Sequence, residues 1–362
     1  MEKFSFFFSI FILIQSLFAV ASSQKTLILG SSFQPPTKAH LALACSLIDA
    51  IDPEVLLLLP TPTYKPGLEE GLTPLLLSQV ALEDFAFECG LNKCDRLDGK
   101  HCLVKKNKKN VMLSASNFLF ELNEHKETAL RESAKAAIRF LPLLRKELGI
   151  EPKDIFWIAG ADSAMSLPRW VDADPTNLGG GFFSLFLEAN WIVVPRSGDM
   201  RVGLNKDHPL MISQEWGWSP LAAKLWTEFM PAEPARDHEH PKLTVYETHW
   251  PEELKLRPEQ PKKPCSVIFY DWDSPEISST AIRSCLKAQY MLEKSPSKSS
   301  PILLQHLDTC LAADSFKEAN SMENSALRSR LDERLSSMVS KNVLQSIYQN
   351  KLYEEKSSSL KL

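Results

Sequence analysis

Several features that mark well-known classes of protein are missing from this chain of 362 residues. Glycine is scarce, at 13 residues against 24 prolines, which excludes a collagen-like or low-complexity chain as a whole. Charge of one sign is not in excess, because 41 Lys and Arg face 45 Asp and Glu, a formal net charge of −4. This balance excludes a generally basic nucleic-acid coat and an acidic disordered tail, so we expect no nucleic-acid partner. The length is enough for one large domain or two smaller ones.

The short motifs of several enzyme and metal-binding classes are also missing. The chain has no G-x-G-x-x-G fingerprint, no Walker loop and no G-x-S-x-G elbow. Its seven cysteines are an odd number without a C-x-x-C pair, which favours scattered reduced thiols over a disulfide framework or a zinc site. His238 and His240, beside Asp237 and Glu239, are the remaining metal candidates, and we interpret them as an exposed loop. We therefore expect no metal bound by the protein's own side chains.

A hydrophobic leader precedes the folded part. Residues 4–21 are almost all apolar behind Lys3, and they end in Ala19-Val20-Ala21, the small-x-small pattern of a signal-peptide cleavage site. The alternatives are an uncleaved anchor, which would bring a membrane contact, and an extension that a cytosolic protein does not use. The leader, residues 1–24, indicates the secretory pathway, whereas the cysteine usage favours the cytoplasm or nucleus.

Apolar runs and amphipathic segments alternate along the rest of the chain. Such alternation predicts an α/β fold, a Rossmann-like doubly wound parallel sheet in an α/β/α sandwich with polar insertions. The expected strands are 25–30, 55–59, 111–119, 154–159, 191–195, 242–248 and 266–270, and the expected helices are 37–51, 72–89 and 124–148. The main domain is expected over 25–286, a flexible Ser/Pro/Lys-containing insertion over 287–338, and a closing helix with a tail over 339–362.

The segment from Gly30 to His40 joins the first strand to the first helix and has the composition of a phosphate site. Small residues at its start let the backbone approach a ligand closely, and Thr37 can cap the helix. His40 falls in the first helical turn, where free N–H groups and the helix dipole favour an anion. A purely structural role is the alternative for a histidine in this position.

A second segment, Ile277-Ser278-Ser279-Thr280-Ala281-Ile282-Arg283, also follows a strand and opens a helix. Ser278 or Ser279 can cap this helix, and Arg283 offers a fork of donors to phosphate oxygens. In a doubly wound fold, both helix starts can face one crevice beyond the carboxyl ends of the strands.

Together the two segments resemble the signatures of the nucleotidylyltransferase superfamily with T/H-x-x-H and I-S-S-T-x-I-R motifs. The match is closest to the eukaryotic nicotinamide mononucleotide adenylyltransferase form, with Thr37 in the first His position and Ser31 where glycine is usual. The resemblance spans 25–353, with poor correspondence in 95–125, 200–264 and 287–338. Tyr64-Lys65 resembles the family's lysine-bearing loop, which meets the mononucleotide phosphate. The basic residue that the family has in the following helix is not evident in 75–79, and Arg169 stands where an apolar residue is common.

The resemblance implies an enzyme that transfers AMP from ATP to nicotinamide mononucleotide and forms NAD and pyrophosphate, with Mg²⁺ bound alongside ATP. The attacking phosphate is already anionic, so catalysis is positioning and charge stabilisation. His40, on the transferring α-phosphate, and Arg283, on the β- and γ-phosphates, are the expected catalytic residues. The expected ATP-binding residues are Ser31, Ser32, Phe33, Thr37, His40, Gly160, Asp162, Ser279, Thr280 and Arg283.

The pyridine mononucleotide is the second substrate that the resemblance implies. Trp170 falls where the family stacks a tryptophan on the pyridine ring. The expected mononucleotide-binding residues are Ser32, Phe33, Lys65, Trp170, Arg196 and Asp271. The alternatives are another adenylyltransferase, acting on nicotinate mononucleotide or phosphopantetheine, and a non-catalytic nucleotide-binding interaction protein. A homo-oligomer stays open.

Overall fold

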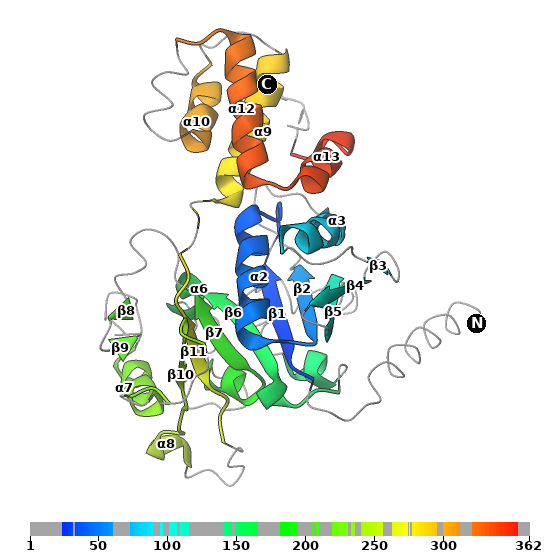
Figure 1. The fold of residues 1–362 in the computed structure, drawn as a ribbon. Helices are drawn as coiled ribbons and strands as arrows, with labels where there is room; N and C mark the ends of the chain where they lie inside the picture. Colours follow the sequence, from blue (N-terminus) through cyan, green and yellow to red (C-terminus); the bar gives the residue numbers. More distant parts are fainter. Residues whose placement is uncertain are drawn as a thin grey trace, which may run out of the picture.

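The structure is a computed structural model, and it describes most of the chain beyond the leader (Figure 1). The described residues are 24–31, 33–60, 73–89, 95–96, 101–106, 109–115, 141–146, 149–165, 182–194, 204–205, 208–209, 219–230, 233–235, 240–255, 263–273, 275, 277–294, 300–311 and 321–353.

A mostly parallel sheet forms the centre of the described part. Its strands lie in the order β10 (Leu243–Tyr246), β11 (Val267–Tyr270), β7 (Asn190–Val194), β6 (Ile155–Gly160), β1 (Thr26–Ser31), β2 (Val55–Pro60), β5 (Lys109–Ala115), β4 (His101–Lys106) and β3 (Asp95–Arg96). The six strands from β11 to β5 are mutually parallel, and β10, β4 and β3 pair antiparallel at the two ends. A separate two-stranded pair joins β8 (Leu204–Asn205) to β9 (His208–Pro209).

The order of the parallel strands identifies the fold. Numbered along the chain, β1, β2, β5, β6, β7 and β11 lie in space as 3-2-1-4-5-6, which is the strand order of a Rossmann-like doubly wound sheet. The predicted fold class is confirmed. The order reverses between β1 and β6, and in folds of this kind ligands bind beyond the carboxyl ends of the strands at such a reversal.

Helices cover both faces of the sheet. The helices are α2 (Lys38–Ile51), α3 (Thr73–Glu88), η1 (Pro152–Asp154), α6 (Ala161–Met165), η3 (Phe182–Leu187), α7 (Pro220–Phe229), α8 (Glu252–Lys255), α9 (Ser279–Lys294), α10 (Pro301–Cys310), α12 (Asn324–Met338) and α13 (Lys341–Gln349). Alternate strand residues point to different cores, as period-2 geometry requires: Leu27 packs with α2 and α3, and its neighbour Ile28 packs with η3 and α7. Strands buried on both faces read as continuous apolar runs, which is why β1 and β2 were predictable.

The secondary-structure predictions hold for most of the described residues, with two exceptions. The strand expected over 111–119 is present as β5, but β3 and β4, which pair antiparallel beside it, were not predicted, because β3 has only two residues and β4 ends in two lysines. Of the long helix expected over 124–148, residues 124–140 and 147–148 lie outside the described residues, and 141–146 are helical.

The prediction of a flexible insertion over 287–338 is wrong for the residues that the structure describes there. α9 runs without a break past residue 286 to Lys294, and α10 and α12 follow (Figure 1). Leu327, Leu331 and Leu335 recur at helical spacing and are fully buried on one face of α12. The composition of this segment is dominated by charged and serine residues on the other faces of the helix, so the leucine spacing was overlooked.

The prediction of scattered reduced thiols is also wrong. Cys45 is disulfide-bonded to Cys89, and Cys285 to Cys310. Cys102 is disulfide-bonded as well, while Cys265 is a free, buried thiol. Sequence spacing did not reveal these pairs because folding brings together cysteines 44 and 25 residues apart.

The closing helix, α13, is docked on α3 by one carboxylate. Buried Asp84 accepts hydrogen bonds from Ser340 Oγ, from Asn342 Nδ2 at 2.8 Å and from the Val343 N–H at 3.4 Å. A carboxylate in this position satisfies orphan donors and complements the helix dipole. The helix expected near the C-terminus is therefore present and joins the same core as α2 and α3.

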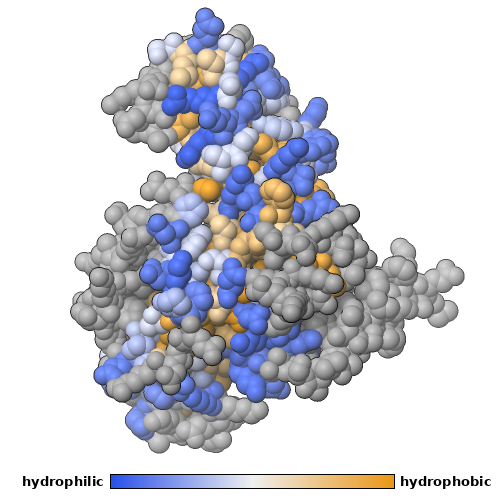
Figure 2. Space-filling view, in the orientation of Figure 1, coloured by the Kyte–Doolittle hydropathy of each residue, from blue (hydrophilic) through white to orange (hydrophobic). Residues whose placement is uncertain are grey.

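The surface is mixed in character. Among the residues that Figure 2 colours, hydrophilic ones predominate, with smaller hydrophobic areas between them. Among the helices that the structure describes, none combines the length and the apolar character needed to cross a membrane. Residues 1–23 of the leader lie outside the described residues.

Candidate functional site

Two of the predicted site segments lie at the reversal of strand order. β1 ends at Ser31 and leads into the loop before α2, and β6 ends at Gly160 and leads directly into α6. β1 and β6 are parallel neighbours, so both segments leave the sheet at the same edge. In open α/β sheets this edge, at the switch point, is where ligands bind.

Gly30 has a steric reason to be glycine. A Cβ atom at this position would lie 2.6 Å from Cη2 of Trp157, the β6 residue whose ring crosses it. A real Cβ is not found that close to another heavy atom, so a side chain here would force the tryptophan or the strand to move. The indole of Trp157 therefore packs against the end of β1, just before the loop that leads into α2.

Phe33 takes a different role from the one expected. Its backbone has a φ of 45°, in the left-handed region, and its side chain is only 1% exposed. The ring packs edge-on against the imidazole of His40, with 5.3 Å between the ring centroids. The side chain thus supports His40 from within the core, and only the backbone of Phe33 remains available to a ligand.

His40 is fixed by a reciprocal cap at the start of α2. Thr37 Oγ1 accepts from the His40 N–H at 3.2 Å, and His40 Nδ1 accepts from the Thr37 N–H at 3.1 Å and lies 2.8 Å from Thr37 Oγ1. Because a backbone N–H can only donate, Nδ1 must be the unprotonated nitrogen of the neutral ring. The proton then lies on Nε2, which is 3.4 Å from Ser31 Oγ. His40 is in this way held as an Nε2–H donor beside the end of β1.

The second predicted motif lies against the first. Ser279 Oγ donates to the carbonyl oxygen of Pro35 at 3.2 Å, and Arg283 Nη1 donates to the carbonyl oxygen of Gln34 at 2.6 Å. These contacts join parts of the chain 244 and 249 residues apart. The start of α9 therefore packs on the loop that leads into α2 and to His40.

Both terminal nitrogens of the Arg283 guanidinium donate hydrogen bonds. Its Nη2 donates to Thr280 Oγ1 at 3.2 Å, one turn earlier on α9, while Ser278 Oγ caps the helix by accepting from the Ala281 N–H at 3.0 Å. Burial lowers the pKa of Arg283, and the proximity of Tyr353 opposes that shift. Arginine nevertheless stays protonated at neutral pH, so the site contains a fixed, partly desolvated cation.

The other predicted residues divide into two groups. Gly160 and Asp162 lie at the β6–α6 junction, and Asp271 is exposed just beyond β11, with β7 between β11 and β6. Four further predicted positions lie outside the described residues: Ser32, Lys65, Trp170 and Arg196.

Sequence reasoning missed three contributors. The carbonyl groups of Gln34 and Pro35 anchor α9, and the ring of Trp157 lies against Gly30. Backbone acceptors leave no side-chain signature in the sequence, and an apolar run does not reveal which of its residues faces a glycine on the neighbouring strand.

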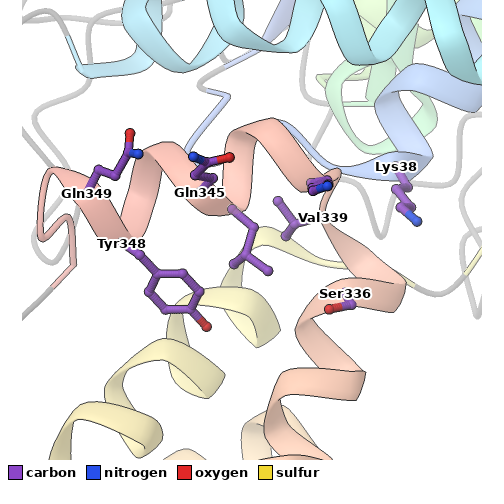
Figure 3. A pocket seen from close by; sticks show the side chains of 8 residues that line it. Lys38, Ser336, Val339, Gln345, Tyr348 and Gln349 are labelled. Atoms are coloured by element: carbon purple, nitrogen blue, oxygen red, sulfur yellow. The ribbon is translucent and has the colours of Figure 1, made fainter.

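A cavity of about 530 Å³ opens beside the first turn of α2, where α12 and α13 meet (Figure 3). It is lined by Lys38, Ser336, Val339, Lys341, Leu344, Gln345, Tyr348 and Gln349. His40 and Arg283 do not line it, although Lys38 belongs to the T-x-x-H segment. Within the described ranges no group of three or more His, Cys, Asp or Glu side chains is arranged to hold a metal ion.

Comparisons with known proteins give a single kind of match. No family model and no curated protein sequence matches the chain. Among solved structures, the chain is similar to a Plasmodium falciparum nicotinic acid mononucleotide adenylyltransferase complexed with NaAD, at a TM-score of 0.36 and 11% sequence identity. The overlap covers 91% of this chain and 97% of that one. A similarity of this size supports no argument about activity, and we base the fold on the strand order.

Proposed function

We propose that the chain is a nicotinamide-nucleotide adenylyltransferase, which transfers AMP from ATP to nicotinamide mononucleotide. The observation that carries the proposal is the contact between the two motif segments, where Arg283 of α9 bonds Gln34 in the loop before His40. Through this contact, the start of α9 with its guanidinium is bonded to the loop that leads into α2 and its capped imidazole, at one edge of a doubly wound sheet. Such a combination of donors suits a polyphosphate.

The role of His40 follows from its tautomer. With Nδ1 committed to Thr37, Nε2–H is the one donor that the ring can offer to an oxygen of the transferring α-phosphate. In the reaction the mononucleotide phosphate oxygen attacks the α-phosphorus, and the bond from that phosphorus to the oxygen bridging it to the β-phosphorus breaks. A donor fixed in advance on this phosphorus stabilises charge in the transition state without reorganising.

Arg283 is proposed to bind the leaving pyrophosphate. Its guanidinium has donors beyond the two that bond Gln34 and Thr280, and the free N–H groups at the start of α9 lie one turn away. Negative charge grows on the β- and γ-phosphates as the bond breaks, so a partly desolvated cation at this place favours departure.

Mg²⁺ is proposed to enter with ATP. It retains several waters and binds largely through substrate phosphates in many nucleotide enzymes, so a site without a dedicated carboxylate cluster fits it. When bound, it would neutralise phosphate charge. The remaining substrate contacts come from the family resemblance: Ser31, Ser32, Thr37, Gly160, Asp162, Ser279 and Thr280 for ATP, and Ser32, Phe33, Lys65, Trp170, Arg196 and Asp271 for the mononucleotide.

The proposal is tested by incubating the purified chain with ATP, Mg²⁺ and one acceptor at a time: nicotinamide mononucleotide, nicotinate mononucleotide or phosphopantetheine. Formation of NAD that falls about 100-fold or more in His40→Ala supports it. His249→Ala is the matched control, because His249 is exposed next to β10 at the far end of the sheet and should leave the rate unchanged.

Two results would contradict parts of the proposal. ATP binding without turnover on any acceptor would indicate a non-catalytic nucleotide-binding protein. Equal rates on nicotinamide and nicotinate mononucleotides would remove the nicotinamide preference while keeping the adenylyltransferase activity.

A further inference from the structure

Each helix that opens at the site is tied by a disulfide close to its site residue. Cys45 follows His40 by little more than one turn of α2 and is bonded to Cys89, which directly follows α3. Cys285 lies two residues after Arg283 on α9 and is bonded to Cys310, the last residue of α10. The two bonds therefore join the two site helices to two different neighbours.

These bonds differ in how well they are shielded. Cys285 and Cys310 are 0% and 1% exposed, whereas Cys45 and Cys89 are both partly exposed. The Cα atoms are 4.9 Å apart in the buried pair and 5.2 Å apart in the other, so both pairs lie within the usual range. Exchange with an external thiol needs access to a sulfur, so the pair between Cys45 and Cys89 is the one that a reductant reaches first.

The site depends on how these helices are placed relative to each other. Ser279 and Arg283 donate to the carbonyl groups of Pro35 and Gln34 at 3.2 and 2.6 Å. Such hydrogen bonds weaken steeply when the donor–acceptor distance grows or the angle at the hydrogen bends. A shift of about 1 Å in either helix is enough to break these bonds and misplace a phosphate ligand. A covalent tie on each helix limits such a shift.

We propose that the disulfides between Cys45 and Cys89 and between Cys285 and Cys310 are positioning elements of the nucleotide site, which is fully assembled only in the oxidised chain. A dithiol reductant would open each bond by thiol–disulfide exchange: two electrons and two protons pass to the two protein sulfurs, and the dithiol becomes a cyclic disulfide. This inference deepens the proposed function and rests on it for its meaning. It places the working enzyme in an oxidising compartment, in agreement with the signal-peptide-like leader.

The first test measures helix order without any ligand. Hydrogen exchange is followed by mass spectrometry in the unaltered chain, in C45A/C89A, in C285A/C310A and in C265A. We expect amides 38–43 of α2 to exchange about tenfold faster or more in C45A/C89A, and amides 281–286 of α9 to do so in C285A/C310A. C265A is the matched control, since it removes the buried free thiol and no tie, and both segments should keep their protection.

Some variants could fail to fold, so the second test uses the unaltered chain. It is titrated with a dithiol, the opened pairs are identified by alkylation and peptide mapping, and the affinity for a non-hydrolysable ATP analogue is measured at each step. The pair between Cys45 and Cys89 is expected to open before the buried pair between Cys285 and Cys310, with a rise of about tenfold or more in Kd and recovery on reoxidation.

Three results would overturn the inference. The first is unchanged hydrogen exchange in both segments. The second is an affinity for the ATP analogue that stays within about twofold of that of the oxidised chain when both pairs are open. The third is faster exchange throughout the sheet, which would show that the bonds stabilise the whole fold rather than the site. If the oxidised chain binds no ATP analogue, the proposed function fails, and the exchange measurement still decides the positioning claim.

Discussion

Arg283 Nη1 donates a hydrogen bond to the carbonyl oxygen of Gln34 at 2.6 Å, joining α9 to the loop before α2. Burial of the guanidinium strengthens this bond, because a charge-assisted hydrogen bond is worth more away from water. The donor belongs to one motif and the acceptor to the other. Because this contact joins the two motif segments, we treat them as parts of one candidate site.

A lysine in place of Arg283 distinguishes the role of its positive charge from the role of its two-pronged hydrogen bonding. Arg283→Lys keeps the positive charge but loses the fork that bonds Gln34 and Thr280 together, so we expect kcat/KM for ATP to fall by about 10- to 100-fold. Lys287→Ala, one turn further along α9, is the control and should change the rate little. Steady-state kinetics check both, and an unaltered rate in Arg283→Lys would show that the fork is not needed.

Thr37 tests the cap that orients His40. Thr37→Ala removes the hydroxyl that bonds the His40 N–H and Nδ1, so the free energy of unfolding should fall by about 1 kcal/mol and activity should fall with it. Thr37→Ser keeps the hydroxyl and should recover most of both. Urea denaturation and the dinucleotide assay provide the readouts. Equal losses in the two variants would assign the effect to the threonine methyl group instead of the cap.

Gly30 tests the close approach of Trp157. Gly30→Ala places a Cβ 2.6 Å from Cη2 of the indole, so the chain should lose about 1 to 3 kcal/mol of stability. Adding Gly30→Ala to a Trp157→Leu background should cost less than it does alone, since the clashing ring is gone. Additive losses in this double-mutant cycle would mean that strain elsewhere in β1 dominates.

Cys265 tests the burial of the free thiol. Burial, and next the charge of Glu188, raise the pKa of this thiol to about 12, so almost all of it is protonated at pH 8 and iodoacetamide should leave it unmodified in the native chain. The folded pKa lies above the unfolded one, so the thiol's contribution to stability is complete at neutral pH and is lost as the pH rises through about 12. Peptide mapping before and after denaturation checks this. Rapid labelling of Cys265 in the native chain would contradict the burial of this thiol.

Much of the fold was predictable from the sequence because its strands are buried on both faces. β1, β2, β6 and β7 read as short apolar runs between helical segments, and chain order with right-handed crossovers leaves few arrangements. The 287–338 region was misjudged because its leucines form a buried stripe within an otherwise polar composition. The disulfides were missed for a different reason: a pairing depends on spatial proximity, which cysteine spacing does not encode.

The candidate site residues could be named in advance because they lie at helix starts. His40 and Thr37 were singled out at the start of α2 and Ser279 and Arg283 at the start of α9, and the structure bonds the start of α9 to the loop before α2. The ring of Phe33 is buried, so only its backbone is left for the ligand role that the resemblance implies. The acceptors of Gln34 and Pro35 are backbone groups, present at every residue, so only the fold could select them.

The most direct test of the central claim follows the α-phosphorus of ATP. The oxidised chain is incubated with nicotinamide mononucleotide, Mg²⁺ and ATP labelled either at the α- or at the γ-phosphorus. The account predicts that the α label appears in the dinucleotide and the γ label in pyrophosphate, and that His40→Ala abolishes both while His249→Ala does neither. Labelled orthophosphate in place of labelled pyrophosphate, or no labelled dinucleotide from any mononucleotide, would contradict it.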